Sequence, residues 1–371
     1  MKEKARYHHI DFLRFVFALI IVYYHILHAN IIPYVNGNET YTQLATLCNY
    51  ASNIVAVFFM ISGVFLYRSY EKSTNNTPVF DYLLGRVVRL APLLILAILL
   101  ESALNKNFNW ERNIINMFFL QCSGLSLEYK GILWYVSSFF IVSILYYAVL
   151  ASISKRKALL LISVLVYFSF AFRINYANGS IGGRETVLYV VNLGVLRAIG
   201  DMGWGIILAV IYEKLHRMKT VYARFANTWV FKVLAGITEM ATLIWLFDYF
   251  LFSTRVNNHI LLIIVFSVLL LIMLSSNSIM AKLFNKRFWG HLGKYAYAIY
   301  VMQQSSFLLM RKTIWQSTEF VAIPWLALSV SVLISTALGI AAYYIIENPC
   351  TKIYQNWHRT YLARCKEMEQ A

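Results

Sequence analysis

Apolar runs of about 20 residues recur along the whole chain, and this feature decides what the chain can fold into. An α-helix of that length crosses the roughly 30 Å hydrocarbon core of a bilayer. Only helices and closed barrels satisfy every backbone hydrogen bond there. Hydrophobic residues make up 60% of the 371 residues and charged residues 13%, whereas soluble domains carry about 25% charged residues. The sequence therefore predicts an all-α, polytopic integral membrane protein.

We expect about ten spanning helices, and an even number returns both termini to the same side of the membrane. Lysine and arginine are concentrated in alternate connecting segments, beginning with the N-terminal one. The positive-inside rule therefore predicts that both termini are cytoplasmic. The expected spans are, approximately, residues 10–30, 50–68, 88–105, 132–152, 158–174, 193–212, 230–252, 259–277, 293–311 and 322–346.

No Pro- or Gly-rich linker divides the chain, so residues 1–371 are expected to form a single membrane domain. Its spans fall within about residues 10–346, and Pro349 is a typical helix stop signal. Residues 347–371 are then expected to form a short basic cytoplasmic tail. The aromatic and apolar spacing of residues 108–121, in a predicted external loop, favours a helix lying in the membrane interface.

The formal net charge of +16 does not indicate nucleic-acid binding, because the basic residues stand between apolar runs and form no contiguous groove-sized patch. The four cysteines lack CxxC spacing, and no metal is expected. Cys48 and Cys122 would both lie outside, where a disulfide could form, but buried free thiols are the expected state.

The first apolar run carries Arg14 and His25, although ionisable groups are expensive in hydrocarbon and usually mark functional sites. Eleven residues separate them, which places both on one helix face but ~16 Å apart along its axis. Such a face suits a cleft that handles an anionic group at one end and a protic group at the other. Alternatively, Arg14 is a snorkelling anchor paired with Asp11, and His25 is a core histidine hydrogen-bonded to a neighbouring helix. His28 lies near the same face, so spacing alone leaves the two histidines equivalent.

Arg86 and Arg89 precede the third run, and their spacing places both guanidinium groups on one side of a helical turn. Arginine forks bind phosphate in a bidentate manner, although the positive-inside rule explains basic residues here equally well. Pro92 is expected to break or kink the helix. A kink above two arginines would suit a phosphate-bearing ligand.

Three weaker signals accompany these. Ser62 and Gly63, in the second run, are small residues that let helices approach closely. Trp134 opens the fourth run, where aromatic-belt anchoring is the simplest account. Arg197 and Asp201 form an i, i+4 pair that is most often structural, although neighbouring glycines could make room for a ligand.

The order of these motifs is informative. The series DFLRFVFALIIVYYH, FFMISGVF, RVVRLAP, LWYVSSFF, GKYAYAIYVMQ and IIENP resembles the acyltransferase-3 family of multispanning membrane O-acyltransferases, of the O-antigen acetylase type. The resemblance covers nearly the whole chain. It implies an O-acetyltransferase in the cell (inner) membrane that moves an acyl group, usually acetyl, from cytoplasmic acetyl-coenzyme A to a hydroxyl of a cell-envelope or secreted carbohydrate.

The resemblance also implies residue roles. His25 is the expected catalytic histidine with Arg14 as its partner, and Arg86 and Arg89 are the expected donor-side arginines. The remaining matches are Ser62 and Gly63 to the small-residue motif, Trp134 to the fourth-helix aromatic and Arg197 to the sixth-helix arginine. The chain departs from the family pattern at Val64, where Phe is frequent, and at Gln303, where the ninth-helix motif commonly ends in His.

Two mechanisms for His25 stay open at this point, because an imidazole can remove the proton of an acceptor hydroxyl or carry the acyl group itself. The acceptor would approach from the opposite face or laterally from lipid, as a lipid-linked saccharide would. The competing hypothesis is a transporter or flippase of a lipid-linked saccharide, whose pore would also be lined by Arg and His.

Overall fold

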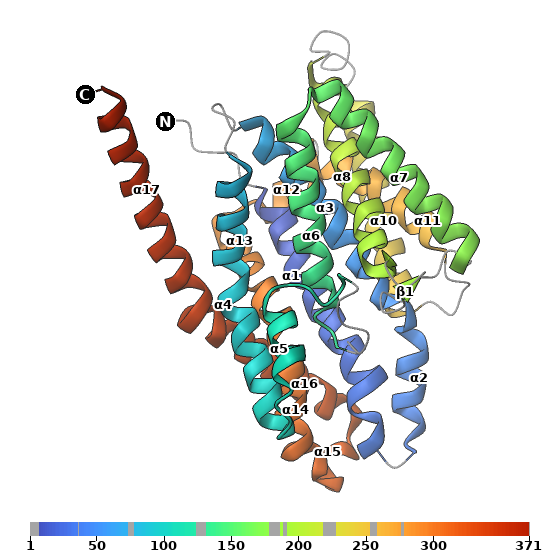
Figure 1. Ribbon diagram of the computed structural model, residues 1–371. Helices are drawn as coiled ribbons and strands as arrows, with labels where there is room; N and C mark the ends of the chain where they lie inside the picture. Colours follow the sequence, from blue (N-terminus) through green and yellow to red (C-terminus); the bar gives the residue numbers. More distant parts are fainter. Residues whose placement is uncertain are drawn as a thin grey trace.

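The computed structural model describes residues 7–35, 37–72, 78–123, 131–177, 186–187, 191–217, 228–252, 258–275 and 278–370. Within these ranges helices make up the regular secondary structure apart from one antiparallel pair of two-residue strands, β1 (Thr186–Val187) and β2 (Val191–Asn192). The long helices run side by side as a bundle (Figure 1). The predicted all-α, polytopic membrane class is confirmed.

Eight helices in the described part of the chain are long and apolar enough to cross a membrane, and they match eight of the expected spans. They are α1 (His8–His25), α3 (Ile54–Lys72), α4 (Val79–Asn105), α6 (Trp134–Ser152), α7 (Lys155–Ala177), α8 (Leu193–Arg217), α10 (Trp229–Leu251) and α16 (Pro324–Ala342).

The other two expected spans correspond to α11 (His259–Leu274) and α14 (Ala296–Lys312), of 16 and 17 residues. α11 is strongly apolar, but α14 carries the fully buried polar residues Gln303, Ser305 and Ser306. Because α14 packs against α1, α4 and α16, protein rather than lipid surrounds these groups, which is the usual environment of polar residues within a membrane.

α4 begins at Val79, well before the predicted 88–105 span, so that prediction of the helix start was wrong. Polar residues interrupt the apolar pattern before residue 88, but they do not end the helix, because they have partners on neighbouring elements. For example, Asp81 Oδ2 lies 4.0 Å from His358 Nε2. Pro92 does not break α4. Near it, the Tyr297 hydroxyl of α14 donates a hydrogen bond to the Leu90 carbonyl at 2.7 Å.

The prediction that Pro349 ends the last helix was also wrong. After α16 the chain passes through a π-helical turn, Tyr343–Glu347, into α17 (Asn348–Gln370). A π turn shifts the hydrogen-bond register, and Pro349 then stands in the first turn of α17, where a missing N–H is tolerated. The predicted tail is therefore a helix, which runs beside part of α4 and leans away from the bundle (Figure 1).

Shorter helices connect the long ones: α2 (Glu39–Leu47), α5 (Trp110–Met117), α12 (Ile279–Phe284), α13 (Arg287–Leu292) and α15 (Thr318–Val321). α5 confirms the helix predicted within residues 108–121, and its Trp110 and Ile114 are exposed. Cys48 and Cys122 are free and buried, as expected. Burial raises the pKa of the Cys48 thiol to about 12 and that of Cys122 to about 11, so neither is a thiolate at neutral pH.

α3 and α8 cross with their backbones in contact. A Cβ atom added to Gly63 would overlap the Met202 carbonyl oxygen, and one added to Gly205 would overlap the Met60 carbonyl oxygen. The close helix approach predicted at Gly63 is confirmed.

Gly63→Ala is expected to lower the free energy of unfolding by about 1–3 kcal/mol, the usual cost of overpacking, because backbone cannot move aside as a side chain can. Thermal unfolding of the purified protein in detergent measures this. Gly85→Ala in α4 is the matched control, since its Cβ would meet only the Tyr354 side chain, at 3.7 Å from the hydroxyl, which is an ordinary contact. Equal destabilisation by both changes would contradict the prediction.

Candidate active site

His25 is the last residue of α1, and a π-helical turn, Ile26–Asn30, follows it directly. Such turns often accompany functional sites. The Asn30 side-chain amide donates to the His25 backbone carbonyl, and Arg311 Nη2 of α14 donates to Asn30 Oδ1 at 2.6 Å. The turn that positions His25 is therefore tied to α14.

The two histidines that spacing leaves equivalent have different surroundings. His25 Nδ1 donates to Gln303 Oε1 of α14 at 3.2 Å. Because an amide oxygen only accepts, the ring's basic lone pair is then on Nε2. His28 Nδ1 instead donates to the Tyr24 carbonyl at 3.2 Å, and its ring stacks on that of Tyr24 with the centroids 4.2 Å apart. Thus the His25 imidazole hydrogen-bonds to α14, whereas that of His28 hydrogen-bonds to its own helical segment and to Asn49.

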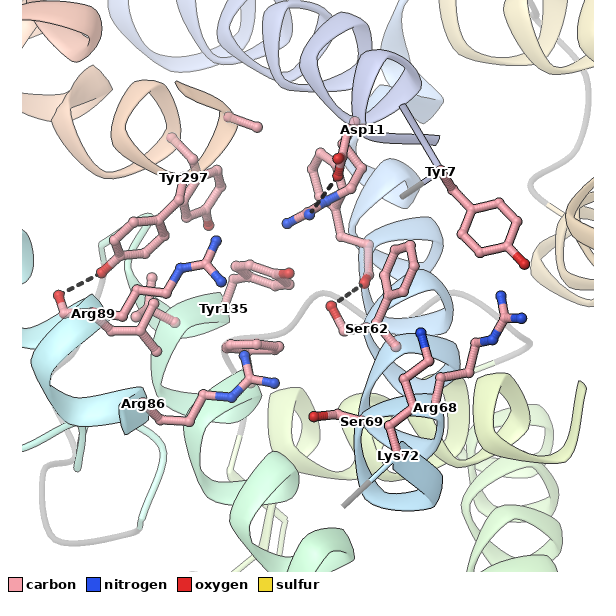
Figure 2. A pocket seen from close by; sticks show the side chains of 18 residues that line it. Tyr7, Asp11, Ser62, Arg68, Ser69, Lys72, Arg86, Arg89, Tyr135 and Tyr297 are labelled. Carbon is pink, nitrogen blue, oxygen red and sulfur yellow. Dashed lines mark hydrogen bonds and ion pairs between the residues drawn. The ribbon is translucent and has the colours of Figure 1, made fainter. Parts of the chain in front are cut away.

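A cavity of about 540 Å³ lies between α1, α3, α4, α6 and α14, at the end of the bundle where α1 begins and α3 ends. Its lining carries five cationic side chains and one acidic side chain, Asp11. The α4 cations and the α3 cations occupy facing walls (Figure 2). The cations are Arg14 on α1, Arg68 and Lys72 on α3, and Arg86 and Arg89 on α4. This excess of positive charge suits a multiply charged anion.

Arg86 and Arg89 line the cavity from successive turns, as their spacing predicts. Arg86 Nε donates to the Tyr82 hydroxyl at 3.1 Å, and its guanidinium lies over the rings of Tyr82 and Phe139. Arg89 Nε lies 4.0 Å from Glu347 Oε1 in the π turn after α16. Both guanidinium groups thus have partners within the protein.

Arg14 lies deeper along α1, with its Nη1 3.7 Å from Asp11 Oδ1. The predicted pairing with Asp11 is confirmed, but Arg14 also lines the cavity. Arg14 therefore both pairs with Asp11 and faces the cavity.

Tyr300 lines the inner part of the cavity and stands three residues before Gln303 in α14. Its hydroxyl donates to the Ile132 carbonyl, and its ring meets Tyr135 edge-on with the centroids 5.3 Å apart. Since one helical turn rises ~5.4 Å, the cavity ends about one turn from the contact between His25 and Gln303. His25 lies beyond this end and not in the wall itself.

A comparison with known protein families assigns the chain to one of them. Residues 7–344 match the model of a family described as an acyltransferase domain. The chain belongs to the acyltransferase-3 family. It is therefore a membrane acyltransferase, as the motif order implies. No curated protein and no solved structure matches the chain significantly.

Of the other residues expected in the acyltransferase-3 site, Ser62 lines the cavity, but Trp134 and Arg197 do not. Trp134 packs against Gly194 at the start of α8, and its neighbour Tyr135 faces the cavity instead.

Arg197 belongs to a separate buried cluster in this acyltransferase. Asp201 Oδ2 lies 3.6 Å from Arg197 Nε, while Asp201 Oδ1 lies 2.7 Å from Arg173 Nη1 and 3.6 Å from His259 Nε2. These side chains are at most 6% exposed. The space beside the α8 glycines is filled, which favours a structural role for the pair of Arg197 and Asp201. The residues that fill it are Tyr146, Val166, Ser169, Phe170 and the Met60 backbone.

Asp201→Ala is expected to lower the free energy of unfolding by about 3–5 kcal/mol, because it leaves two buried arginines without their shared carboxylate. Glu213→Ala is the matched control, since Glu213 lies 3.7 Å from Arg217, whose side chain is 72% exposed, and such surface pairs contribute about 1 kcal/mol or less. Denaturant unfolding in detergent compares the two. A loss no greater than that of the control would contradict the structural role.

The α3 cations Arg68 and Lys72 were not predicted as site residues. Both are basic residues at the end of the second run, where the positive-inside rule explains them without a ligand. Their separation by four residues, which places both on one side of a helix, is the feature of the sequence that could have indicated a shared site. Tyr297 and Tyr300, within the motif GKYAYAIYVMQ, also line the cavity.

Proposed function

We propose that this acyltransferase takes its acyl group, acetyl in the first instance, from acyl-coenzyme A and esterifies a hydroxyl of a cell-envelope or exopolysaccharide sugar. The cationic cavity that leads toward His25 carries the proposal. Coenzyme A has three phosphates at one end and the thioester at the other, connected by an extended arm. The cavity has cations around its outer part and ends near His25, so the phosphates would meet the cations while the thioester lies toward the histidine.

The proposed orientation places both termini in the cytoplasm and the protein in the inner membrane, in keeping with the distribution of lysine and arginine. α1 begins and α17 ends at the same end of the bundle (Figure 1). The cavity then opens to the cytoplasm, where acyl-coenzyme A is made. A lipid-linked saccharide would reach His25 from the opposite face or from the surrounding lipid.

In the proposed reaction, His25 Nε2 removes the proton of the acceptor hydroxyl while that oxygen attacks the thioester carbonyl. The new carbon–oxygen bond forms, the carbon–sulfur bond breaks, and the departing thiolate receives the proton from His25. Gln303 keeps the imidazole in the required tautomer through Nδ1. Arg14, between the phosphate-binding cations and His25, would hold the donor arm.

Mass spectrometry of envelope glycans from strains with and without the gene tests the function. We expect the polysaccharide to persist and its acyl ester to disappear when the gene is deleted. Incubation of the purified protein with labelled acetyl-coenzyme A and the unesterified glycan should restore the ester. Unchanged ester content would contradict the proposal, and loss of the exported polysaccharide itself would favour the flippase.

A further inference from the structure

We infer that Arg68 and Lys72 form a second phosphate subsite, which binds the 3′-phosphate of coenzyme A and makes the enzyme select intact coenzyme A thioesters over thioesters that lack this phosphate. This inference rests on the proposed function. It assigns the α3 wall of the cavity, which faces the wall formed by Arg86 and Arg89 (Figure 2).

Arg68 is pre-positioned for an anion. Its guanidinium lies over the rings of Tyr7 and Tyr212, 4.6 and 5.6 Å from their centroids. Its Nη1 is buried and has no hydrogen-bond partner among the residues that the structure describes, and a buried charged donor without an acceptor is costly. Glu71, the acidic residue of α3 nearest to Arg68 in sequence, forms ion pairs with Lys155 at 2.7 Å and Arg217 at 3.9 Å instead. A phosphate oxygen would supply the missing acceptor.

Lys72 follows Arg68 by four residues, so both lie on one side of α3. Like charges at this spacing repel each other, and a phosphate between them would relieve the repulsion. Lys72 is exposed. It lines the cavity together with Ser69, which stands between Arg68 and Lys72 in the sequence (Figure 2).

The order of the lining residues along α3 assigns the phosphate. Phe58 and Ser62 line the inner part of the cavity, and Arg68 and Lys72 come successively closer to the end of the helix. The thioester must reach the inner end, next to His25, so the nucleotide lies in the outer part. With the diphosphate against the α4 arginines, the 3′-phosphate of the ribose is the anion left for the α3 wall.

The test compares acetyl-coenzyme A with 3′-dephospho-acetyl-coenzyme A as donors for the purified full-length protein. We expect the wild type to prefer the intact donor by about tenfold to hundredfold in kcat/KM, the range for charge-assisted hydrogen bonds to one phosphate. Lys72→Met and Arg68→Met should reduce this preference by slowing only the intact donor. Arg86→Met should slow both donors alike, and Lys282→Met, outside the cavity, should change neither.

Equal use of the two donors by the wild type would overturn the subsite and leave the proposed function standing. A preference that survives Lys72→Met, an exposed position where folding is not at risk, would also overturn it. Failure of the wild type to use either donor would overturn the proposed function, and the subsite with it.

Discussion

Replacing His25 with alanine is expected to lower acyl transfer by about 10²–10⁴-fold, the usual contribution of a general acid–base residue. The imidazole is oriented by Gln303 at 3.2 Å, and alanine removes the group that carries the proton in the proposed reaction. Single-turnover transfer from labelled acetyl-coenzyme A measures the loss. In cells, the same variant should retain its polysaccharide and lack the ester.

His28→Gln is the matched control, because His28 lies in the same turn region but stacks on Tyr24 and bonds to its carbonyl. Activity within a few-fold of the wild type is expected. If the two histidine variants lost activity equally, the assignment of His25 would fail. Full activity of His25→Ala would remove the proposed mechanism altogether.

Replacing Arg86 and Arg89 together with glutamine is expected to weaken the affinity for acetyl-coenzyme A by about 10²-fold or more. Each charge-assisted hydrogen bond is worth about 1.5–3 kcal/mol, and 1.4 kcal/mol corresponds to tenfold in a dissociation constant. The loss should be larger at low salt, because salt screens the attraction that the arginines supply. Titration calorimetry at two ionic strengths measures both effects.

Two comparisons keep this result interpretable. Arg86→Gln alone preserves the pair of Arg89 with the buried Glu347, so its effect on binding is separated from any effect on stability. Arg359→Gln, on exposed α17 outside the cavity, should leave donor binding unchanged. Unaltered affinity in the double variant would exclude the α4 arginines from the donor site.

Much of the fold is predictable because lipid imposes its own composition on the surface of a bundle. The prediction is least accurate where protein or a cavity replaces lipid. α4 extends to Val79 although Asp81 and Arg86 interrupt its apolar pattern, since Asp81 faces His358 and Arg86 faces the cavity. Hydropathy cannot distinguish a charged residue that ends a helix from one that continues it toward a partner.

The site was predictable only in part, for a related reason. Helical spacing assumes a uniform helix, but the π turn after His25 separates its surroundings from those of His28. Charge counting explains Arg68, Lys72, Arg86 and Arg89 alike as positive-inside residues, and only the tertiary structure shows that all of them line one cavity. In the sequence, Arg197 is likewise an arginine next to or within an apolar run. In the structure, however, it pairs with Asp201 in the buried cluster and does not line the cavity.

The burial of polar groups on α14 also bears on how the enzyme is made. A segment enters the bilayer from the translocon according to its own hydrophobicity, and polar side chains oppose entry. α14 contributes Gln303 to the contact with His25 and packs against the strongly apolar α16. We therefore expect α14 to integrate as a pair with α16 during synthesis. His25, although it is among the first residues to leave the ribosome, would acquire its partner only when the C-terminal part of the chain has followed.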